Sequence, residues 1–159
     1  EPPIVEKRID QEAKAHGGAN ALPADDMSVH DALDAAKAKV DAGADSAITQ
    51  YFFNADAYFR FVDDCDAMGV RIPIVPGIMP IASASKLGRF SDACGAELPR
   101  WIRRRLEGYG DDVASVRAFG LDVVTELCDK LLQGGAPGLH VYTMNQAGPT
   151  STLWQRLGL

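Results

Sequence analysis

Three short apolar segments of strand length are separated by longer segments with helical periodicity, and this alternation limits the possible folds most strongly. The apolar segments are residues 46–50, 72–75 and 138–143. Strands that alternate with helices form parallel sheets, because each parallel connection needs a crossover and a helix supplies it. We therefore predict an α/β chain whose parallel sheet is covered by helices.

Apolar residues that recur every three or four positions predict the helices around these strands. The helix before the first strand has Ser28 as its capping residue and ends before Gly43. Pro76 and Gly77 follow the second apolar segment, and we expect them to end that strand. The remaining predicted helices cover residues 55–68, 83–94, 97–107, 112–133 and 150–156.

The number of predicted strands is too small for a complete fold of this class. A (β/α)₈ barrel typically needs about 250 residues, and the chain has 159. Residues 1–27 mix charges with Gly and Pro, so we predict a loop or disordered segment there. Residues 28–159 are predicted to form parallel βα units of an incomplete (β/α)₈ TIM-type barrel. Because the sequence begins with Glu1, we expect a processed or truncated chain.

Charge and cysteine content exclude several classes of function. The chain has 22 acidic and 16 basic residues and a net charge of −6, which disfavours nucleic acid and anionic membranes as partners. No apolar run approaches the roughly 18 residues of a membrane span. The 3 cysteines are far apart and show no metal-binding spacing. We therefore expect a cytoplasmic protein with reduced thiols and no metal site.

Candidate ligand residues follow from the rule that barrels bind ligands at the carboxyl ends of their strands. Three segments qualify, at residues 49–50, 76–80 and 143–145. Gln50 carries the donors and the acceptor needed to bind an amide-like edge such as a pterin, although hydrogen bonding to loop backbone is the competing interpretation. Phe90 has the shape to stack on a flat ligand, and core packing is its competing interpretation.

Several sequence strings, in order, resemble methylenetetrahydrofolate reductases. The resemblance is continuous from about residue 28 to the end of the chain, and the ordered series makes it specific. The strings are KVDAGAD at 39–45, ITQYFF at 48–53, YFRF at 58–61, PGIMP at 76–80, PRW at 99–101, LEGYGDD at 106–112, GLH at 138–140 and YTMN at 142–145.

This resemblance implies a flavoprotein barrel of one-carbon metabolism. In that family NADH or NADPH reduces FAD, and the reduced flavin passes hydride to 5,10-methylenetetrahydrofolate. Gln50 matches a glutamine that contacts folate and nicotinamide, and Phe90 matches a phenylalanine that stacks on both. Lys39 matches a lysine near the FAD phosphates.

The sequence also departs from the family pattern. Lys86 stands where a folate-contacting glutamine is common, and Gln146 stands where an arginine is common, so both are substrate-binding candidates. Ala35 and Ala38 replace polar residues that reach the FAD. No segment matches the glutamate that acts as general acid in the family, so we assign no catalytic residue to this chain.

We therefore predict that the complete enzyme forms 5-methyltetrahydrofolate and that this chain alone is inactive, because the reaction needs a bound flavin and an acid. The alternative is a non-catalytic folate- or nucleotide-binding half-barrel, since a parallel sheet with open edges favours pairing with another chain. The expected partners are folate, a nicotinamide dinucleotide, and either further copies in a homo-oligomer or a complementary barrel half.

Overall fold

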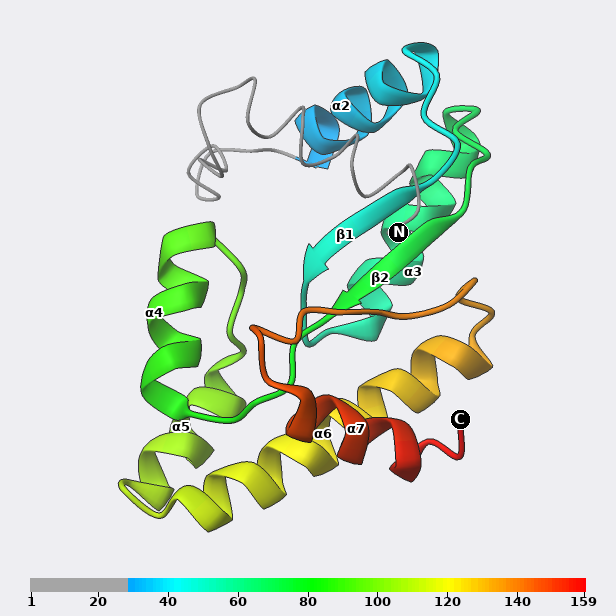
Figure 1. Ribbon diagram of the computed structural model, residues 1–159. Helices are drawn as coiled ribbons and strands as arrows, with labels where there is room; N and C mark the ends of the chain where they lie inside the picture. The colour runs from blue at the N-terminus through cyan, green and yellow to red at the C-terminus, as the bar shows by residue number, and fades with distance from the viewer. Residues whose placement is uncertain (1–28) are drawn as a thin grey trace.

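A parallel sheet surrounded by helices forms the described part of the chain, residues 29–159 of a computed structural model (Figure 1). The α/β prediction with parallel strands is thus confirmed. The segment at 1–27 and the predicted cap at Ser28 lie outside the described residues. In chain order the elements are α2 (Val29–Asp41), β1 (Ala47–Tyr51), α3 (Ala55–Ala67), β2 (Ile74–Ile78), α4 (Ala84–Cys94), α5 (Arg100–Tyr109), α6 (Val113–Gln133), β3 (His140–Val141) and α7 (Ala147–Arg156).

The sheet has the order β1-β2-β3, and both pairings are parallel. Ala47 pairs with Ile74, and Gly77 pairs with His140. Within the described residues β1 and β3 are therefore the two edges of the sheet. All three carboxyl ends point the same way, and α4 lies beyond the ends of β1 and β2 (Figure 1).

Local side-chain caps explain where three of the helices begin. The Asn54 side chain accepts hydrogen bonds from the first turn of α3, the Ser83 side chain caps α4, and the Asp112 side chain caps α6. These residue types satisfy amide groups that have no partner inside a helix. Helix α4 ends at Gly95, whose positive φ of 65° suits glycine.

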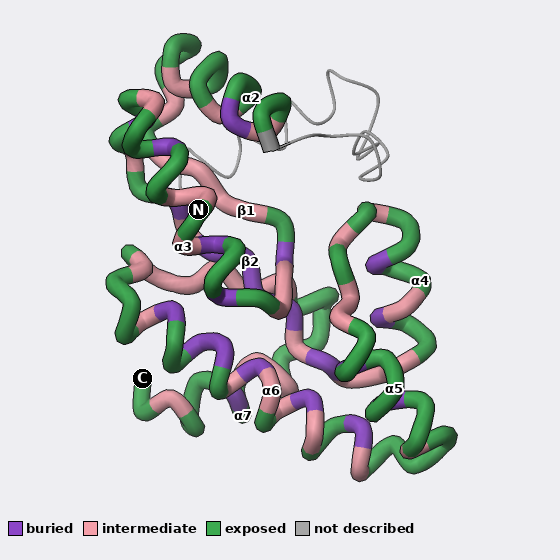
Figure 2. The backbone as a smooth tube through the Cα atoms, turned by 180° about the vertical axis from the view of Figure 1, so that it is seen from behind, coloured by how far each residue is buried: buried purple, intermediate pink, exposed green. Residues whose placement is uncertain are grey.

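The hydrophobic core joins the sheet to the helices packed around it. Ile78 on β2, Ile102 on α5, and Val124 and Leu131 on α6 are almost completely buried. Figure 2 shows that buried positions recur along one side of α6, as expected for a helix that packs on a sheet. Among the described residues no helix, α6 included, is both long enough and apolar enough to cross a membrane.

The second and third strands differ from their predicted bounds. The second was expected at 72–75 with a break at Pro76, but β2 continues to Ile78. It continues because the Gly77 amide finds an acceptor in the Thr49 side chain, 2.9 Å away. The third was expected over 138–143, but β3 contains only His140 and Val141, the two residues that pair with the end of β2.

Candidate functional site

A β-bulge shapes the end of β1, where sequence analysis places the first ligand residue. Ile48 pairs with Val75 and Tyr51 pairs with Gly77, so two residues of β1, Thr49 and Gln50, lie opposite the single residue Pro76. Proline has no amide hydrogen to offer the ladder. An extra residue in one strand changes the direction of the side chains that follow. The bulge therefore places Gln50 in an irregular, exposed segment of β1.

The Gln50 side chain is held by its own backbone. Its Oε1 accepts a hydrogen bond from the Tyr51 amide at 3.0 Å. This bond agrees with the backbone-binding interpretation of Gln50. The side-chain NH₂ group has no acceptor among the described residues, and Gln50 lines neither of two pockets in the described part of the chain. An oriented amide group with free donors is therefore present at the end of β1.

The larger of these two pockets lies between α4, the start of α6 and the segment that follows β3. Its volume is about 910 Å³, which falls within the range of about 300–1,000 Å³ typical of small-molecule sites. Three of the predicted substrate-binding residues, Lys86, Phe90 and Gln146, line it. The fold thus brings together residues that are far apart in the sequence.

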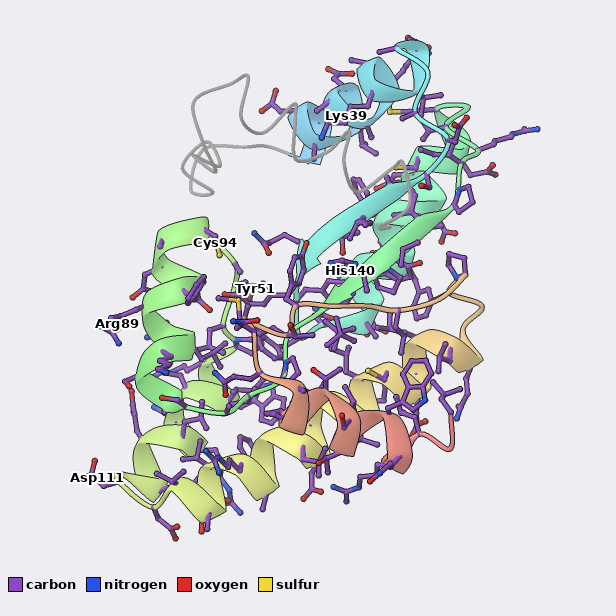
Figure 3. All side chains as sticks on the ribbon, viewed as in Figure 1. Lys39, Tyr51, Arg89, Cys94, Asp111 and His140 are labelled. Carbon is purple, nitrogen blue, oxygen red and sulfur yellow. The ribbon has the colours of Figure 1, made fainter. Side chains whose placement is uncertain are left out.

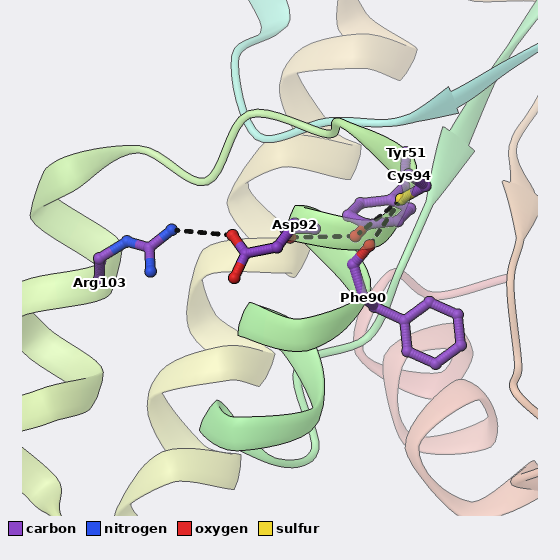
Figure 4. A network of polar contacts seen from close by, with 6 residues as sticks. Tyr51, Phe90, Asp92, Cys94 and Arg103 are labelled. Atoms are coloured by element: carbon purple, nitrogen blue, oxygen red, sulfur yellow. Dashed lines mark hydrogen bonds and ion pairs between the residues drawn. The ribbon is translucent and has the colours of Figure 1, made fainter. Parts of the chain in front are cut away.

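Phe90 forms part of the pocket wall on α4. The residue is 43% exposed, and Figure 4 shows its ring directed away from Tyr51 and Cys94. An aromatic ring with this exposure is not a core side chain in the described part of the chain. The exposure of Phe90 therefore argues against core packing, and stacking on a ligand stays a prediction.

The pocket carries more positive than negative charge. Lys86 and Arg89 on α4 and Arg117 on α6 line it, whereas Asp111 is its one acidic lining residue. None of the three cations takes part in an ion pair with another described residue. Figure 3 shows Arg89 and Asp111 at the outer edge of this region. A positive pocket in a chain of net charge −6 is suited to an anionic ligand.

Arg89 and Arg117 were not among the ligand residues predicted from the sequence. Arg89 is three positions after Lys86, so the two residues share one side of a helix, and this spacing was a usable signal. Arg117 belongs to a different helix, and its proximity to α4 depends on tertiary packing. No sequence pattern indicates that proximity.

The segment after β3 closes the pocket with a strained turn. Met144 and Asn145 have φ values of 49° and 60°, and the Gln146 amide donates to the Thr143 carbonyl at 2.9 Å. Two central residues with positive φ are characteristic of a type I′ turn, which usually contains glycine or asparagine. Met144 in this conformation is uncommon, and strained residues concentrate at functional sites.

Tyr51 joins the end of β1 to α4. Its side chain is buried, and its hydroxyl lies 3.0 Å from Ser91 Oγ and 3.6 Å from Cys94 Sγ. Figure 4 shows Tyr51 and Cys94 beside the ion pair that joins Asp92 to Arg103 on α5. Burial raises the pKa of Tyr51 to about 12, so the hydroxyl keeps its proton at neutral pH.

Lys39, the predicted cofactor-binding residue, lies apart from these groups. It is an exposed residue in the last turn of α2 and lines neither pocket. Figure 3 shows it far from Arg89 and Asp111. Within residues 29–159 no group of three or more His, Cys, Asp or Glu side chains is arranged to hold a metal ion.

The family model and the curated relatives that match this chain carry the same description. A family model described as methylenetetrahydrofolate reductase matches residues 14–158. The match to the model thus begins earlier in the chain than residue 28, from which the sequence strings resemble the family. The 5,10-methylenetetrahydrofolate reductase of Buchnera aphidicola subsp. Acyrthosiphon pisum is 39% identical over 123 residues, which cover 77% of this chain and 42% of that protein.

Eukaryotic relatives match the same share of the chain. A probable methylenetetrahydrofolate reductase (NADH) of Oryza sativa subsp. japonica is 42% identical, and a probable methylenetetrahydrofolate reductase (NADPH) of Caenorhabditis elegans is 41% identical. Each match covers 77% of this chain, but only 21% and 19% of those proteins. The chain thus spans less than half the length of the curated relatives it matches.

One solved structure supports the fold. It is an uncharacterized protein from Clostridium thermocellum, described as binding two copies of 5-methyl-5,6,7,8-tetrahydrofolic acid. The TM-score is 0.55 at 20% sequence identity, and the alignment covers 81% of this chain and 48% of that chain. At this identity the likeness concerns the arrangement of helices and strands.

Proposed function

Because the chain belongs to the methylenetetrahydrofolate reductase family, we propose that it supplies the folate-binding side of a barrel that converts 5,10-methylenetetrahydrofolate to 5-methyltetrahydrofolate. NADH or NADPH is the source of the hydride, and relatives of both kinds support a nicotinamide co-substrate. The methylene carbon gains the hydride, and the nitrogen released from it needs a proton. No described residue is assigned as the donor of that proton.

The observation that carries this proposal is the exposed ring of Phe90 in a positively charged pocket. A tetrahydrofolate carries a reduced pterin at one end and glutamate carboxylates at the other, and its flat aminobenzoyl ring lies directly beside the glutamate. The Phe90 ring supplies a stacking surface, and Lys86, only four residues before it, supplies a cation. The pocket therefore offers both kinds of contact within about one turn of α4.

The two glutamines complete the proposed substrate contacts. Gln146 lines the pocket opposite α4, where its amide can hydrogen-bond a polar group of the ligand. Gln50 lies outside the pocket lining, at the bulge of β1, and its free NH₂ donors suit a carbonyl or ring nitrogen. We propose that a bound folate extends from Lys86 and Phe90 toward Gln50 at the end of β1.

FAD is the cofactor that the family implies, and Lys39 is the residue proposed to contact its phosphates. The described residues alone do not fit an enclosed flavin, because Lys39 is exposed on α2 and lines neither pocket. We therefore derive no step of the reaction through FAD from this chain.

The proposed barrel requires more strands than the described three. β1 and β3 both have a free edge within residues 29–159, and open edges favour addition of further strands. We propose that the sheet is part of a (β/α)₈ barrel, completed either by a longer polypeptide or by a partner chain. A cytoplasmic location is proposed as well, because Cys65, Cys94 and Cys128 are all free thiols.

Purified protein tests the proposal directly. A protein containing this chain, supplied with FAD, is expected to consume NADH or NADPH only when 5,10-methylenetetrahydrofolate is added. For the 159-residue chain alone, we expect a colourless protein whose tryptophan fluorescence is quenched by 5-methyltetrahydrofolate. That result favours the folate-binding half-barrel as the role of the isolated chain, whereas the absence of binding in a calorimetric titration with 5-methyltetrahydrofolate contradicts the folate site.

A further inference from the structure

Helix α4 carries the two pocket residues Lys86 and Phe90, yet it lies beyond the end of the sheet and not across its face (Figure 1). Side-chain polar contacts tie α4 to two residues of other elements among the described residues, Arg103 and Tyr51. Asp92 pairs with Arg103 on α5 at 3.7 Å, but both side chains are largely exposed, so the pair contributes little. The other tie is the buried contact of Tyr51 with the last turns of α4, through Ser91 and Cys94.

We propose that the Tyr51 hydroxyl is a positioning group, which holds α4 against the end of β1 through Ser91 and thereby fixes the Phe90 ring in the pocket wall. Tyr51 and Ser91 are each only 2% exposed, so water does not readily replace the bond between them. Ser91 directly follows Phe90 in the sequence. Movement of Ser91 away from Tyr51 therefore moves the backbone that carries the Phe90 ring.

Cys94 reinforces the same contact. Its thiol lies 2.9 Å from the Phe90 carbonyl oxygen and 3.6 Å from the Tyr51 hydroxyl. Helix α4 thus makes two contacts with one hydroxyl group. A phenylalanine at position 51 would keep the packing of the ring but would lose both contacts.

Tyr51 also contacts the other proposed ligand residue. Its backbone amide donates to the Gln50 side chain at 3.0 Å, while its hydroxyl meets Ser91, 40 positions later in the sequence. One residue therefore orients Gln50 at the strand end and Phe90 on the helix. A ligand that touches both needs their separation to be constant, and Tyr51 is the covalent and hydrogen-bonded link between them.

The test is the removal of one oxygen atom, with a matched control. Tyr51→Phe deletes the hydroxyl that meets Ser91. Tyr58→Phe deletes a hydroxyl of similar burial that donates to the Ile74 carbonyl at 2.7 Å, on α3 and outside the pocket lining. Ser91→Ala removes the same contact from the α4 side, which covers the case in which the Tyr51 variant does not fold. Each variant is made in the full chain.

Two measurements are compared, folate binding and hydrogen exchange. Only the first of them rests on the proposed folate site. Binding of 5-methyltetrahydrofolate is expected to weaken about three- to tenfold in Tyr51→Phe and in Ser91→Ala, the factor that corresponds to one ordinary hydrogen bond. Hydrogen exchange is expected to accelerate in residues 84–94 of both variants and not elsewhere. In Tyr58→Phe both folate affinity and exchange of 84–94 should match the wild type.

The outcomes separate the two proposals. If the wild type binds 5-methyltetrahydrofolate and both Tyr51→Phe and Ser91→Ala bind it equally well, Tyr51 is not a positioning residue. If the wild type does not bind it, the folate proposal fails, and the exchange of residues 84–94 alone decides the role of Tyr51. Faster exchange confined to those residues supports the tie, whereas unchanged exchange, or an equal change in Tyr58→Phe, overturns it.

Discussion

The Gly77 amide donates a hydrogen bond to Thr49 Oγ1 at 2.9 Å, and this bond replaces a ladder bond where β1 bulges opposite Pro76. The Tyr142 hydroxyl donates to the Thr49 carbonyl oxygen at 3.0 Å. Thr49 therefore connects β1, β2 and the segment after β3 at the carboxyl end of the sheet. Gly77 lies in the middle of these contacts.

Replacement of Gly77 by alanine is expected to destabilise the fold. A Cβ at this position would overlap the Thr49 carbonyl oxygen and lie 2.8 Å from the Tyr142 ring. Such crowding costs about 1–3 kcal/mol in well-packed regions. Gly108→Ala is the control, because that glycine lies in α5 and an added methyl group would have open space around it, and it should gain about 0.5–1 kcal/mol. Urea unfolding measures both, and equal stability of the two variants would contradict the crowding.

Phe90→Ala is expected to weaken folate binding without a large change in stability. The ring is 43% exposed, and surface substitutions usually change stability by less than about 0.5 kcal/mol. Loss of aromatic stacking should reduce the affinity for 5-methyltetrahydrofolate about tenfold. Phe59→Ala is a matched control, since Phe59 packs on Tyr58 in α3. Phe59→Ala should lower the melting temperature and leave the affinity for 5-methyltetrahydrofolate unchanged. If Phe90→Ala instead lowers the melting temperature and leaves that affinity unchanged, Phe90 has a structural role.

Gln50→Glu tests the NH₂ donors of the Gln50 side chain separately from its accepting oxygen. The carboxylate keeps an oxygen that accepts the Tyr51 amide hydrogen bond, whereas the NH₂ donors are lost. We expect an unchanged melting temperature and weaker binding of 5-methyltetrahydrofolate. Gln50→Ala loses both groups and should bind no better than the glutamate variant. Wild-type affinity in Gln50→Glu would show that the ligand does not use the amide donors.

Local patterns predicted the helices well, because their signals are local. Asn54, Ser83 and Asp112 cap helices through amides two or three residues away, and periodic apolar residues follow each of them. The strand through Pro76 and Gly77 was missed because its missing ladder bond is supplied by Thr49, 28 positions earlier. A local rule that treats Pro-Gly as a break has no access to that partner.

The residues of the candidate site also fall into those that the sequence identified and those that only tertiary packing brings together. Lys86 and Phe90 were identified by resemblance, and their common helix brings them to one pocket. Arg117 and the contact of Tyr51 with Ser91 were missed, because α6 and β1 reach α4 only through tertiary packing. Lys39 was predicted from the same resemblance, and its contact with a cofactor stays a prediction.

Asp112 is expected to make stability depend on pH in the acid range. Hydrogen bonds from Ser115, first from its side chain and then from its backbone amide, lower the pKa of Asp112 below its ordinary value of 3.8. The stabilisation is therefore complete above pH 3.8 and is lost as the pH falls further through the folded-state pKa. Asp112→Asn keeps a capping oxygen without the charge. The stability difference between wild type and variant should shrink below pH 3.8; a constant difference would contradict the charge effect.

Cys94 is expected to react first with a thiol reagent in the folded protein. Burial raises the pKa of Cys128 to about 12 and also raises the pKa of Cys65, and both side chains are 0% exposed. Cys94 is only partly buried, although its thiol contacts the Phe90 carbonyl and the Tyr51 hydroxyl. Because the thiolate is the reactive form, Cys65 and Cys128 should react only after unfolding.

The rate at Cys94 also reports on the contact between Tyr51 and α4. Labelling with a chromogenic disulfide reagent should modify one thiol in the native state, and Cys94→Ser should abolish that reaction. In Tyr51→Phe the Cys94 thiol loses its contact at 3.6 Å, so we expect faster labelling at Cys94 and no new labelling at Cys128. Fast native labelling at Cys65 or Cys128 would mean that the core between α3 and α6 opens more readily than its burial indicates.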